Sequence, residues 1–481
     1  MVAGEFDDGT ANVPGGLSGA VERVLVAGAG IAGLTVANAL THAGVECVLL
    51  EARDRIGGRL HTVDLGGTPV DLGGSWINTP AGNPMSAFAR LAGVSGRSAD
   101  PVPETAAFDC GEARPLTAAE TSDLFGLYLE GFPAATGPLL AELGPETSAA
   151  AGIEAFVAAR WPAGPVDSPV DGPARRARQI LEAGVEAESA SPAVGQSLRW
   201  MRNEIEYEGN YFGDVPEGGY RRLVTAMASG VDVRLGRPVT EVEVAPDGVR
   251  AVTADGAAEE GSHLVVALPL GVLKRGVPRF SPALPPDRMA AITRLGFGRF
   301  EKVALRFAEP FWRAAGFPHL MIFPRAAGQS MVWAIGLDAF GGGPVIVFFV
   351  FHSDAERLAG AAADAPVRWA LGQLAEVTGR PCPEPLAAAV SGWAVDPWTS
   401  GAYTHIPPGA SPADADLLGQ PVGGRLLFAG EHTQSTRLAY ADGALSSGIR
   451  EAKRLLGTPS VRLAVHPQGH AARQMTRTAA G

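Results

Sequence analysis

Apolar residues in the first fifty positions follow a strand pattern, then a helix pattern, then a strand pattern again. Residues 24–27 form a short apolar run, and apolar residues recur at helical spacing over about residues 31–43. Gly44 ends the predicted helix, and residues 45–50 form a second apolar run that leads to Glu51. This order predicts a βαβ unit.

A similar succession of elements lies near the other end of the chain. Residues 426–429 are apolar and predict a buried strand, which Gly430 and Glu431 follow. An open loop then leads to Tyr440, and a helix is predicted to begin near Asp442. By itself this pattern is equally typical of ordinary packing between a strand and a helix.

Between these ends the pattern changes twice. Residues 85–215 are predicted to be largely helical, and residues 293–393 to contain both strands and helices. Val303, Leu305 and Phe307 occupy alternate positions, which predicts a strand with one buried face, and "GGGPVIVFFVF" predicts an apolar strand after a glycine turn. Together these patterns predict an α/β protein.

Composition narrows the class of protein. The chain has 481 residues, more than one hydrophobic core usually covers, so we expect two domains. Its net charge of -12 argues against nucleic acid or an anionic membrane as the main partner. Cys47, Cys110 and Cys382 are widely spaced, which excludes a disulfide framework and a clustered zinc site and favours the cytoplasm. No segment approaches the roughly 20 apolar residues that span a bilayer, and no metal is expected.

The turn between the first predicted strand and helix carries a glycine motif. Gly28, Gly30 and Gly33 form G-x-G-x-x-G, in which the glycines allow a tight turn, backbone approach to a pyrophosphate and close helix packing. The helix N-terminus offers free N–H groups to phosphates, and Glu51 is placed to bind ribose hydroxyls. In this context the motif favours dinucleotide binding over a purely structural βαβ unit.

The residues after Glu51 favour FAD over NAD. In "EARDRIGGRL", Arg53 and Arg59 flank a glycine pair, which suits the second phosphate and the ribityl half of a long cofactor. The next strand ends in Gly73 and Gly74 before Trp76, which again permits close approach of the backbone. Each feature alone is typical of surface charge and turns, whereas together they indicate a cofactor site.

The sequence resembles the flavin-containing amine oxidases, which include monoamine oxidases, polyamine oxidases, histone demethylases and L-amino-acid oxidases. The resemblance covers about residues 21–456. It rests on motifs in one order: "GAGIAGL", "EARDRIGGR", "DLGGSWI", "VPEGGYRRLVTAMA", "GRPVTEVE", "LVVALPLGVLK", "KVALRFAEPFW", "WAVDPWTSGAYT" and "LLFAGEHT". These motifs are specific for the family and much less so for the substrate.

The resemblance implies FAD as the cofactor. Monoamine oxidases attach their flavin through a cysteine at the position of Ala402, so we expect FAD to be bound non-covalently here. Val239 is implied at the adenine, Glu431 near the ribityl chain and Trp393 beside the isoalloxazine ring. The implied cofactor-binding residues are Gly28, Gly30, Ile31, Ala32, Gly33, Glu51, Ala52, Arg53, Gly58, Arg59, Gly73, Gly74, Ser75, Trp76, Val239, Trp393, Gly430, Glu431, Ala439, Tyr440 and Ala444.

Three residues are implied in catalysis. Lys302 matches a lysine that hydrogen-bonds through water to flavin N5, where its charge stabilises developing superoxide. Tyr403 and Tyr440 match the walls of an aromatic cage that holds and desolvates an amine. The alternatives are a surface lysine and two core tyrosines.

The scattered motifs imply a Rossmann-type FAD-binding domain assembled from residues 20–84, 216–292 and 394–458. A mixed α+β substrate-binding domain would comprise residues 85–215 and 293–393. We expect residues 1–19 to be a flexible leader and residues 459–481 to be a tail that frays.

The implied activity is FAD-dependent amine oxidation. The α-carbon of a neutral amine would give a hydride to flavin N5, the imine would hydrolyse to an aldehyde or ketone, and oxygen would be reduced to hydrogen peroxide. A flavin-dependent dehydrogenase or desaturase of a C–N or C–C bond in a specialised metabolite stays open, as does an FAD-bound protein without turnover. A small amine and oxygen are the expected partners, and the oligomeric state, a homodimer included, is left open.

Two observations on the sequence concern the identity of the substrate. Some polyamine oxidases have a carboxylate where this chain has Asn78, which weakens a polyamine assignment. No arginine stands out as a partner for an α-carboxylate, so an amino-acid substrate is neither supported nor excluded.

Overall fold

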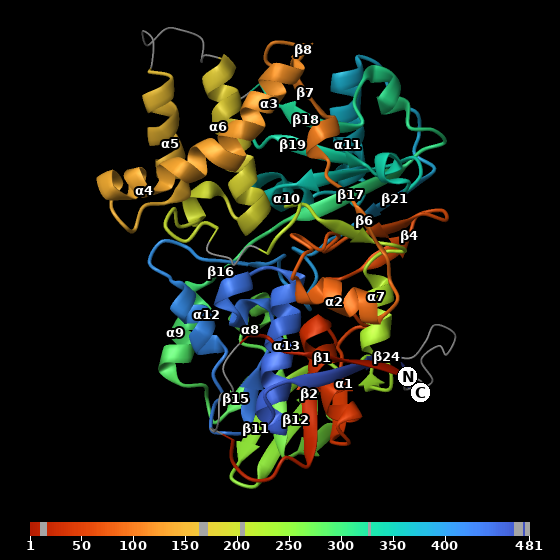
Figure 1. Cartoon of the computed structure of the whole chain (residues 1–481), viewed down its shortest axis with the longest axis vertical. Helices are drawn as coiled ribbons and strands as arrows, with labels where there is room; N and C mark the ends of the chain where they lie inside the picture. Colours follow the sequence, from red (N-terminus) through yellow and green to blue (C-terminus); the bar gives the residue numbers. More distant parts are fainter. Residues whose placement is uncertain (10–16, 163–171, 203–206, 326–328, 466–474, 477–481) are drawn as a thin grey trace.

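The computed structural model describes residues 1–9, 17–162, 172–202, 207–325, 329–465 and 475–476. In Figure 1 the chain forms a lower lobe, built from the first residues and the last, and an upper lobe of helices above a second sheet. The chain passes between the two lobes several times, so segments far apart in sequence meet at their junction.

A parallel sheet of six strands forms the centre of the lower lobe. Every pair of neighbouring strands in it is parallel. The order is β23 (Leu426–Phe428), β14 (His263–Val266), β2 (Arg23–Ala27), β3 (Glu46–Leu50), β10 (Asp232–Arg234) and β25 (Met475–Thr476).

Alternation along β2 explains why both faces of this sheet are covered. Val24 and Val26 pack in the cluster under α1 (Ile31–His42) and α13 (Ala441–Leu456), whereas Leu25 and Ala27 pack in the cluster on the opposite face. The two helices lie close together because Gly448 of α13 has no side chain. A Cβ atom there would lie 2.6 Å from the carbonyl oxygen of Ala32. The first turn of α1 therefore packs against the middle of α13.

The opposite face carries a second, four-stranded sheet and several short helices. The strands are β13 (Ala258–Gly261), β12 (Gly248–Thr253), β11 (Val239–Ala245) and β15 (Arg279–Ser281). The α-helices on this face are α8 (Leu270–Lys274), α9 (Pro286–Arg294) and α12 (Pro412–Leu418), whereas α2 (Pro84–Leu91) and α7 (Arg221–Met227) pack beside α1 and α13.

A sheet of seven strands forms the base of the upper lobe. Its strands pair antiparallel except for the parallel pair of β18 and β7. The order is β21 (Ala387–Val390), β17 (Glu301–Arg306), β20 (Val345–Val350), β19 (Val332–Gly336), β18 (His319–Phe323), β7 (Thr105–Asp109) and β8 (Arg114–Pro115).

Helices cover the upper sheet on both sides. The α-helices are α3 (Ala118–Gly126), α4 (Phe132–Leu143), α5 (Ala149–Arg160), α6 (Gly172–Ser189), α10 (His352–Ala359) and α11 (Ala365–Thr378). The segment 85–215 is helical over much of its length, as expected, but it also supplies β7 and β8. The pattern of "TAAFD" is too short and too weakly apolar to separate this strand from a loop.

Four pairs of short strands complete the chain. They are β1 (Val2–Phe6) with β24 (Val461–Val465), β4 (Thr62–Asp64) with β5 (Pro69–Asp71), β6 (Gly96–Ser98) with β9 (Asp214–Pro216), and β16 (Gly296–Phe297) with β22 (Thr404–His405).

The two ends of the chain differ from what we expected. Residues 2–6 and 461–465 do not fray but form β1 and β24, which pair antiparallel along their whole length. Residues 10–16, 466–474 and 477–481 of the expected leader and tail lie outside the described residues. Lys453 holds Asp7 and Asp8 at 2.6 and 2.7 Å, which attaches the N-terminal segment to α13. The pairing depends on contacts between residues more than 450 positions apart, which local sequence patterns do not show.

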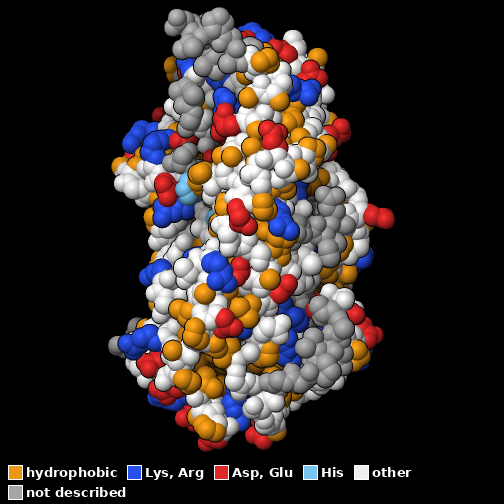
Figure 2. Space-filling view, turned by 90° about the vertical axis from the view of Figure 1, so that its left-hand side faces the viewer, with side chains coloured by type: hydrophobic (Ala, Val, Ile, Leu, Met, Phe, Trp, Pro, Cys, Tyr) orange, Lys and Arg blue, Asp and Glu red, His pale blue; other side chains and the backbone are white. Residues whose placement is uncertain are grey.

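No helix in the described part of the chain is long and apolar enough to cross a membrane. Figure 2 shows acidic and basic side chains interspersed on the face it presents, with small apolar groups between them.

Candidate active site

One cavity of about 360 Å³ lies where the two lobes meet. It is lined by residues from the glycine turn, from the β17 and β20 strands and from the N-terminus of α13. All of the residues that the sequence indicated line this cavity except Gly33: Gly28, Gly30, Ile31, Ala32, Glu51, Ala52, Arg53, Gly58, Arg59, Gly73, Gly74, Ser75, Trp76, Val239, Lys302, Trp393, Tyr403, Gly430, Glu431, Ala439, Tyr440 and Ala444.

The glycine turn leaves the N-terminus of α1 open to the cavity. Gly30 precedes the helix, and no side chain within the described residues caps it. A Cβ atom on Gly30 would meet no atom within 4 Å, so the cavity lies directly beside this position. Gly33 lies behind it, where a Cβ atom would come within 2.0 Å of the carbonyl oxygen of Gly28. Gly30 therefore leaves room for a ligand, and Gly33 allows the helix to pack.

Glu51 holds the backbone on both sides of the turn. Its two carboxylate oxygens accept hydrogen bonds from the N–H groups of Ala29 at 2.7 Å and Arg53 at 2.9 Å. The guanidinium of Arg53 pairs with Asp396 at 2.7 Å. These contacts place one carboxylate and one cation at the end of the cavity that also includes Val239.

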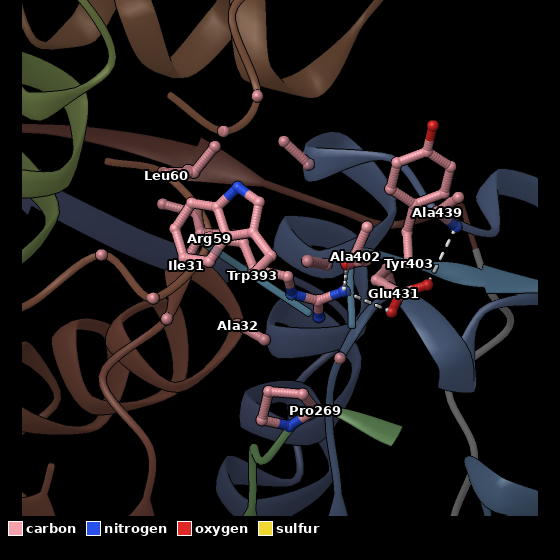
Figure 3. A pocket seen from close by; sticks show the side chains of 18 of the residues that line it. Ile31, Ala32, Arg59, Leu60, Pro269, Trp393, Ala402, Tyr403, Glu431 and Ala439 are labelled. Carbon is pink, nitrogen blue, oxygen red and sulfur yellow. Dashed lines mark hydrogen bonds and ion pairs between the residues drawn. The ribbon is translucent and has the colours of Figure 1, made fainter. Parts of the chain in front are cut away.

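Arg59 connects the start of the chain to its end. Its Nη1 donates to the carbonyl oxygen of Ala402 at 2.7 Å and to Oε1 of Glu431 at 2.9 Å (Figure 3). Glu431 also accepts from the Thr404 hydroxyl at 3.0 Å and the Ala439 N–H at 3.0 Å. Burial alone would raise the pKa of Glu431, but the charge and hydrogen bond of Arg59 hold it below its ordinary value.

Trp393 is fixed beside the cavity by three contacts. Its ring nitrogen donates to the carbonyl oxygen of Leu72 at 3.0 Å, and its backbone N–H donates to the buried carboxylate of Glu301 at 2.9 Å. Gly73 lies against the ring, since a Cβ atom there would be 3.4 Å from it. A flat aromatic surface is thereby held next to bare backbone.

Lys302 lies on the cavity face of β17. The neighbouring Val303 and Leu305 point into the core on the other side of the sheet, so strand alternation turns Lys302 toward the cavity. Its Nζ donates to the carbonyl oxygen of Gly73 and to Oγ of Ser75, both at 2.6 Å. Burial lowers the pKa of Lys302 to about 8, and the nearby charge of Asp71 opposes part of that shift. Lys302 is therefore a buried cation and not a surface lysine.

Aromatic rings surround the ammonium group of Lys302. Nζ lies 5.6 Å from the ring centre of Trp76 and 5.5 Å from that of Phe349. Edge-to-face and tilted contacts, with ring centres 5.5 to 6.5 Å apart, connect these two rings and their aromatic neighbours to one another. We call this part of the cavity the aromatic compartment; its rings are Trp76, Phe212, Phe300, Trp333, Phe349 and Tyr403.

The two predicted cage tyrosines are held differently. The hydroxyl of Tyr403 donates to the carbonyl oxygen of Ala187, and burial, followed by nearby tyrosine and carboxylate groups, raises its pKa. Tyr440 precedes α13, and the guanidinium of Arg437 lies 4.0 Å from its ring centre. Both tyrosines line the cavity, whereas the core alternative would place them away from it.

These residues suit a dinucleotide that carries a flavin. The open helix N-terminus and the space beside Gly30 match a pyrophosphate, and Arg53 adds positive charge. The apolar wall of Trp393 and the bare backbone at Gly73 match a flat ring system.

Several lining residues were not predicted from the sequence. Phe349 lies in the apolar run that predicted β20. Because this run is apolar throughout, it does not indicate which of its residues face a cavity. Glu188 and Tyr128 belong to the helical segment, where no motif marks them. Asp396 and Glu301 do not line the cavity but hold Arg53 and Trp393 beside it, and such indirect contacts become visible only in the fold.

A parallel βαβ unit whose glycine turn opens onto a cavity with a flat aromatic wall defines a dinucleotide-binding oxidoreductase. Residues 31–456 match the profile of the flavin-containing amine oxidoreductases, and the chain belongs to this family. Membership of this family implies FAD as its cofactor.

Three comparisons illustrate the relationship. The chain is 31% identical over 468 residues to lysine-specific histone demethylase 1 homolog 1 of Oryza sativa subsp. japonica, covering 90% of this chain and 52% of that protein. It therefore spans about half the length of this relative. It is 31% identical over 449 residues to polyamine oxidase 3 of the same plant, covering 89% and 88%. A triple mutant of putrescine oxidase with redesigned cofactor binding has the same fold, with a TM-score of 0.70 at 21% identity over 91% and 99% of the two chains.

Proposed function

We propose that this protein oxidises the α-carbon of a small amine to an imine, which water hydrolyses to an aldehyde or ketone, while oxygen is reduced to hydrogen peroxide. The observation that carries the proposal is the position of Lys302, a buried cation that lies among the rings of the aromatic compartment and donates to Gly73, the residue beside the Trp393 ring. FAD, when bound, supplies the hydride acceptor and the reaction with oxygen.

The residues of the chain have separate tasks in this proposal. The turn at Gly30 and the open end of α1 bind the pyrophosphate, and Glu51 binds ribose hydroxyls. Tyr403 and Tyr440 bind the amine between apolar walls, where loss of water favours its neutral form. Lys302 supplies positive charge where oxygen gains electrons.

Non-covalent attachment of FAD is part of the proposal. Ala402, which precedes Tyr403, has no nucleophilic side chain, and none of the described lining residues is a cysteine. Acid precipitation of the purified protein is expected to release all of the yellow colour into the supernatant. Colour that stays with the precipitated chain would contradict this statement.

We also propose that the expected division into domains holds. Five of the six strands of the parallel sheet come from residues 20–84, 216–292 and 394–458, and all seven strands of the upper sheet come from residues 85–215 and 293–393. The remaining strand, β25, lies beyond residue 459. Removal of FAD is expected to destabilise the lower lobe more than the upper one, which hydrogen exchange measures.

The test of the activity is an anaerobic screen. The purified yellow protein is mixed without oxygen with primary, secondary and tertiary amines, diamines and an N-methylated lysine peptide, and the flavin absorbance is followed. We expect at least one amine to bleach the flavin, and equimolar peroxide to appear when oxygen is admitted. If the flavin stays oxidised with every amine but is bleached by a metabolite with no C–N bond to oxidise, the protein is a desaturase and the proposal is wrong.

A further inference from the structure

Most of the charged side chains in the described cavity lining lie outside the aromatic compartment, and two lie within it. Glu51, Arg53, Arg59, Arg237 and Glu431 belong to the cofactor-binding turns. Lys302 and Glu188 are the two that lie with the aromatic rings. Among the described residues, recognition of a charge on the distal part of a substrate therefore depends on these two groups.

Glu188 is already neutralised by an arginine. It lies at the end of α6, with 14% of its side chain exposed, and its Oε1 accepts from Nε of Arg202 at 3.1 Å. The Tyr128 hydroxyl donates to the same oxygen at 2.6 Å. Burial and Glu188 raise the pKa of Tyr128 well above its ordinary value, so its hydroxyl remains a donor. One oxygen of the carboxylate is thus fully engaged.

The second oxygen is available. No described residue donates a hydrogen bond to Oε2 of Glu188, although Glu188 lines the cavity. A carboxylate with one engaged oxygen and one free oxygen accepts a further hydrogen bond without needing another counter-ion. The group that fits is a neutral donor such as a hydroxyl.

A second ammonium group does not fit here. Lys302 already brings one cation into the compartment, and the charge of Glu188 is balanced by Arg202. Asn78, a further polar residue of the cavity lining, is uncharged, and its Nδ2 donates to the carbonyl oxygen of Tyr211 at 3.0 Å. Among the described residues a distal ammonium would meet aromatic rings and no unpaired carboxylate, so the loss of its water there is strongly unfavourable.

We propose that Arg202 is a specificity-determining residue which, by neutralising Glu188, makes the site select an arylalkylamine with a distal hydroxyl group and reject diamines and polyamines. The aromatic rings contact the body of the substrate, and Oε2 of Glu188 accepts from its hydroxyl group. This inference rests on the proposed amine oxidation.

The test compares three amines with the FAD-loaded protein and its variants. The amines are 2-phenylethylamine, its 4-hydroxy derivative and 1,4-diaminobutane, and the measurements are the anaerobic rate of flavin reduction and the Kd by calorimetry. In the wild type we expect kcat/KM for the hydroxylated amine to exceed that for phenylethylamine about tenfold, because hydrogen bonds to charged groups are the stronger ones. The diamine is expected to be at least about a hundredfold poorer.

The variants separate the two parts of the inference. Glu188→Gln is expected to remove the preference for the hydroxyl group, so that kcat/KM for the two arylalkylamines differs by less than about threefold, since both share the ring contacts. Arg202→Met frees the charge of Glu188 and is expected to improve the diamine at least about tenfold. Arg202→Lys keeps the pair and is the matched control. If Arg202→Met does not fold, the double variant Glu188→Gln/Arg202→Met removes both charges, and its diamine Kd is expected to stay as weak as in the wild type.

Two results would overturn the inference. One is a wild-type protein that binds or oxidises the diamine as well as the hydroxylated amine. The other is a preference for the hydroxyl group that survives Glu188→Gln. If calorimetry shows the expected preferences but no amine reduces the flavin, the specificity stands and the proposed oxidation fails. If amines reduce the flavin without these preferences, the oxidation stands and the role of Arg202 fails.

Discussion

The ammonium nitrogen of Lys302 lies 2.6 Å from the carbonyl oxygen of Gly73, at the point where the strand β5 leads into the cavity lining. The other short contact, to Oγ of Ser75, is also to a neutral oxygen. The buried carboxylate nearby, Asp71, offers its backbone oxygen at 3.3 Å, while its side chain binds Thr62 and the N–H of Tyr220. The charge of Lys302 is therefore held in place without being cancelled by a direct ion pair.

Removing this charge is expected to slow the reaction of the reduced protein with oxygen. Lys302→Met should lower the reoxidation rate constant on the order of a hundredfold, the usual effect of losing one preorganised electrostatic contact. Stopped-flow mixing of the reduced protein with oxygen measures it. Lys274→Met is the matched control, because Lys274 is exposed and donates to Thr293 away from the cavity. Equal rates in wild type and Lys302→Met would show that this charge has no part in oxygen reduction.

The same reaction is expected to depend on pH. Burial lowers the pKa of Lys302 to about 8, so the side chain is charged below this value and neutral above it. The reoxidation rate constant should therefore fall as the pH rises through about 8. Lys302→Arg keeps its charge to much higher pH, and the fall is expected to disappear. An identical inflection in the arginine variant would assign it to another group.

The glycine turn provides a matched pair of substitutions. Gly30→Ala places a Cβ atom in open space and should leave the apoprotein as stable as the wild type while weakening FAD binding. Gly33→Ala places a Cβ atom 2.0 Å from the Gly28 carbonyl oxygen, and should lower the free energy of unfolding by about 3 kcal/mol. Thermal melts of the apoproteins and FAD titrations distinguish the two. A destabilised Gly30→Ala apoprotein would show that the space beside Gly30 is needed by the protein itself.

The pair of Arg59 and Glu431 is expected to affect both stability and cofactor binding. Arg59→Met leaves a buried carboxylate without its cation and should cost about 3 kcal/mol of unfolding free energy at pH 7. The pKa of Glu431 is lowered in the folded wild type, so its stabilising effect is present above its unfolded pKa and is lost as the pH falls through the folded value. The difference between the two proteins should therefore shrink in acid. A difference that does not change with pH would mean that Arg59 acts only through packing.

Glu186 of α6 should destabilise the protein as the pH rises. Burial raises its pKa to about 7, although Ser330 donates a hydrogen bond to it at 3.0 Å. The favourable contribution of its protonated form is fully present below its unfolded pKa and is lost as the pH passes through about 7. Between pH 4.5 and pH 8, Glu186→Gln should gain up to about 3 kcal/mol of unfolding free energy relative to the wild type. Denaturant titrations at the two pH values measure this, and parallel curves would contradict it.

The sequence predicts the cofactor end of the site well because its residues are close together or obey strong local rules. The turn at Gly28 and Gly30 follows from backbone geometry, and the strand that carries Lys302 follows from alternation. The predicted helix over residues 31–43 agrees with α1 (Ile31–His42) to within one residue. These features need only short segments of chain to be recognised.

The substrate end escapes prediction because it depends on contacts between distant segments. The role of Glu188 in the site depends on its contacts with Arg202 and Tyr128, and Tyr128 lies 60 residues before Glu188 in the sequence. The aromatic compartment likewise collects rings from β19, β20 and several loops, each of which is ordinary core material in its own segment. Short-range patterns do not contain this information.

Strand β23 and the loop that carries Glu431 are among the last parts of the cofactor cavity to leave the ribosome. A nascent chain that ends before Leu426 already contains the glycine turn and Arg59, but it lacks the carboxylate that binds Arg59 and the whole of α13. FAD has only part of its binding surface at that stage. Loading of the cofactor is therefore expected only after α13 has been synthesised, which places it late in the folding of the cavity.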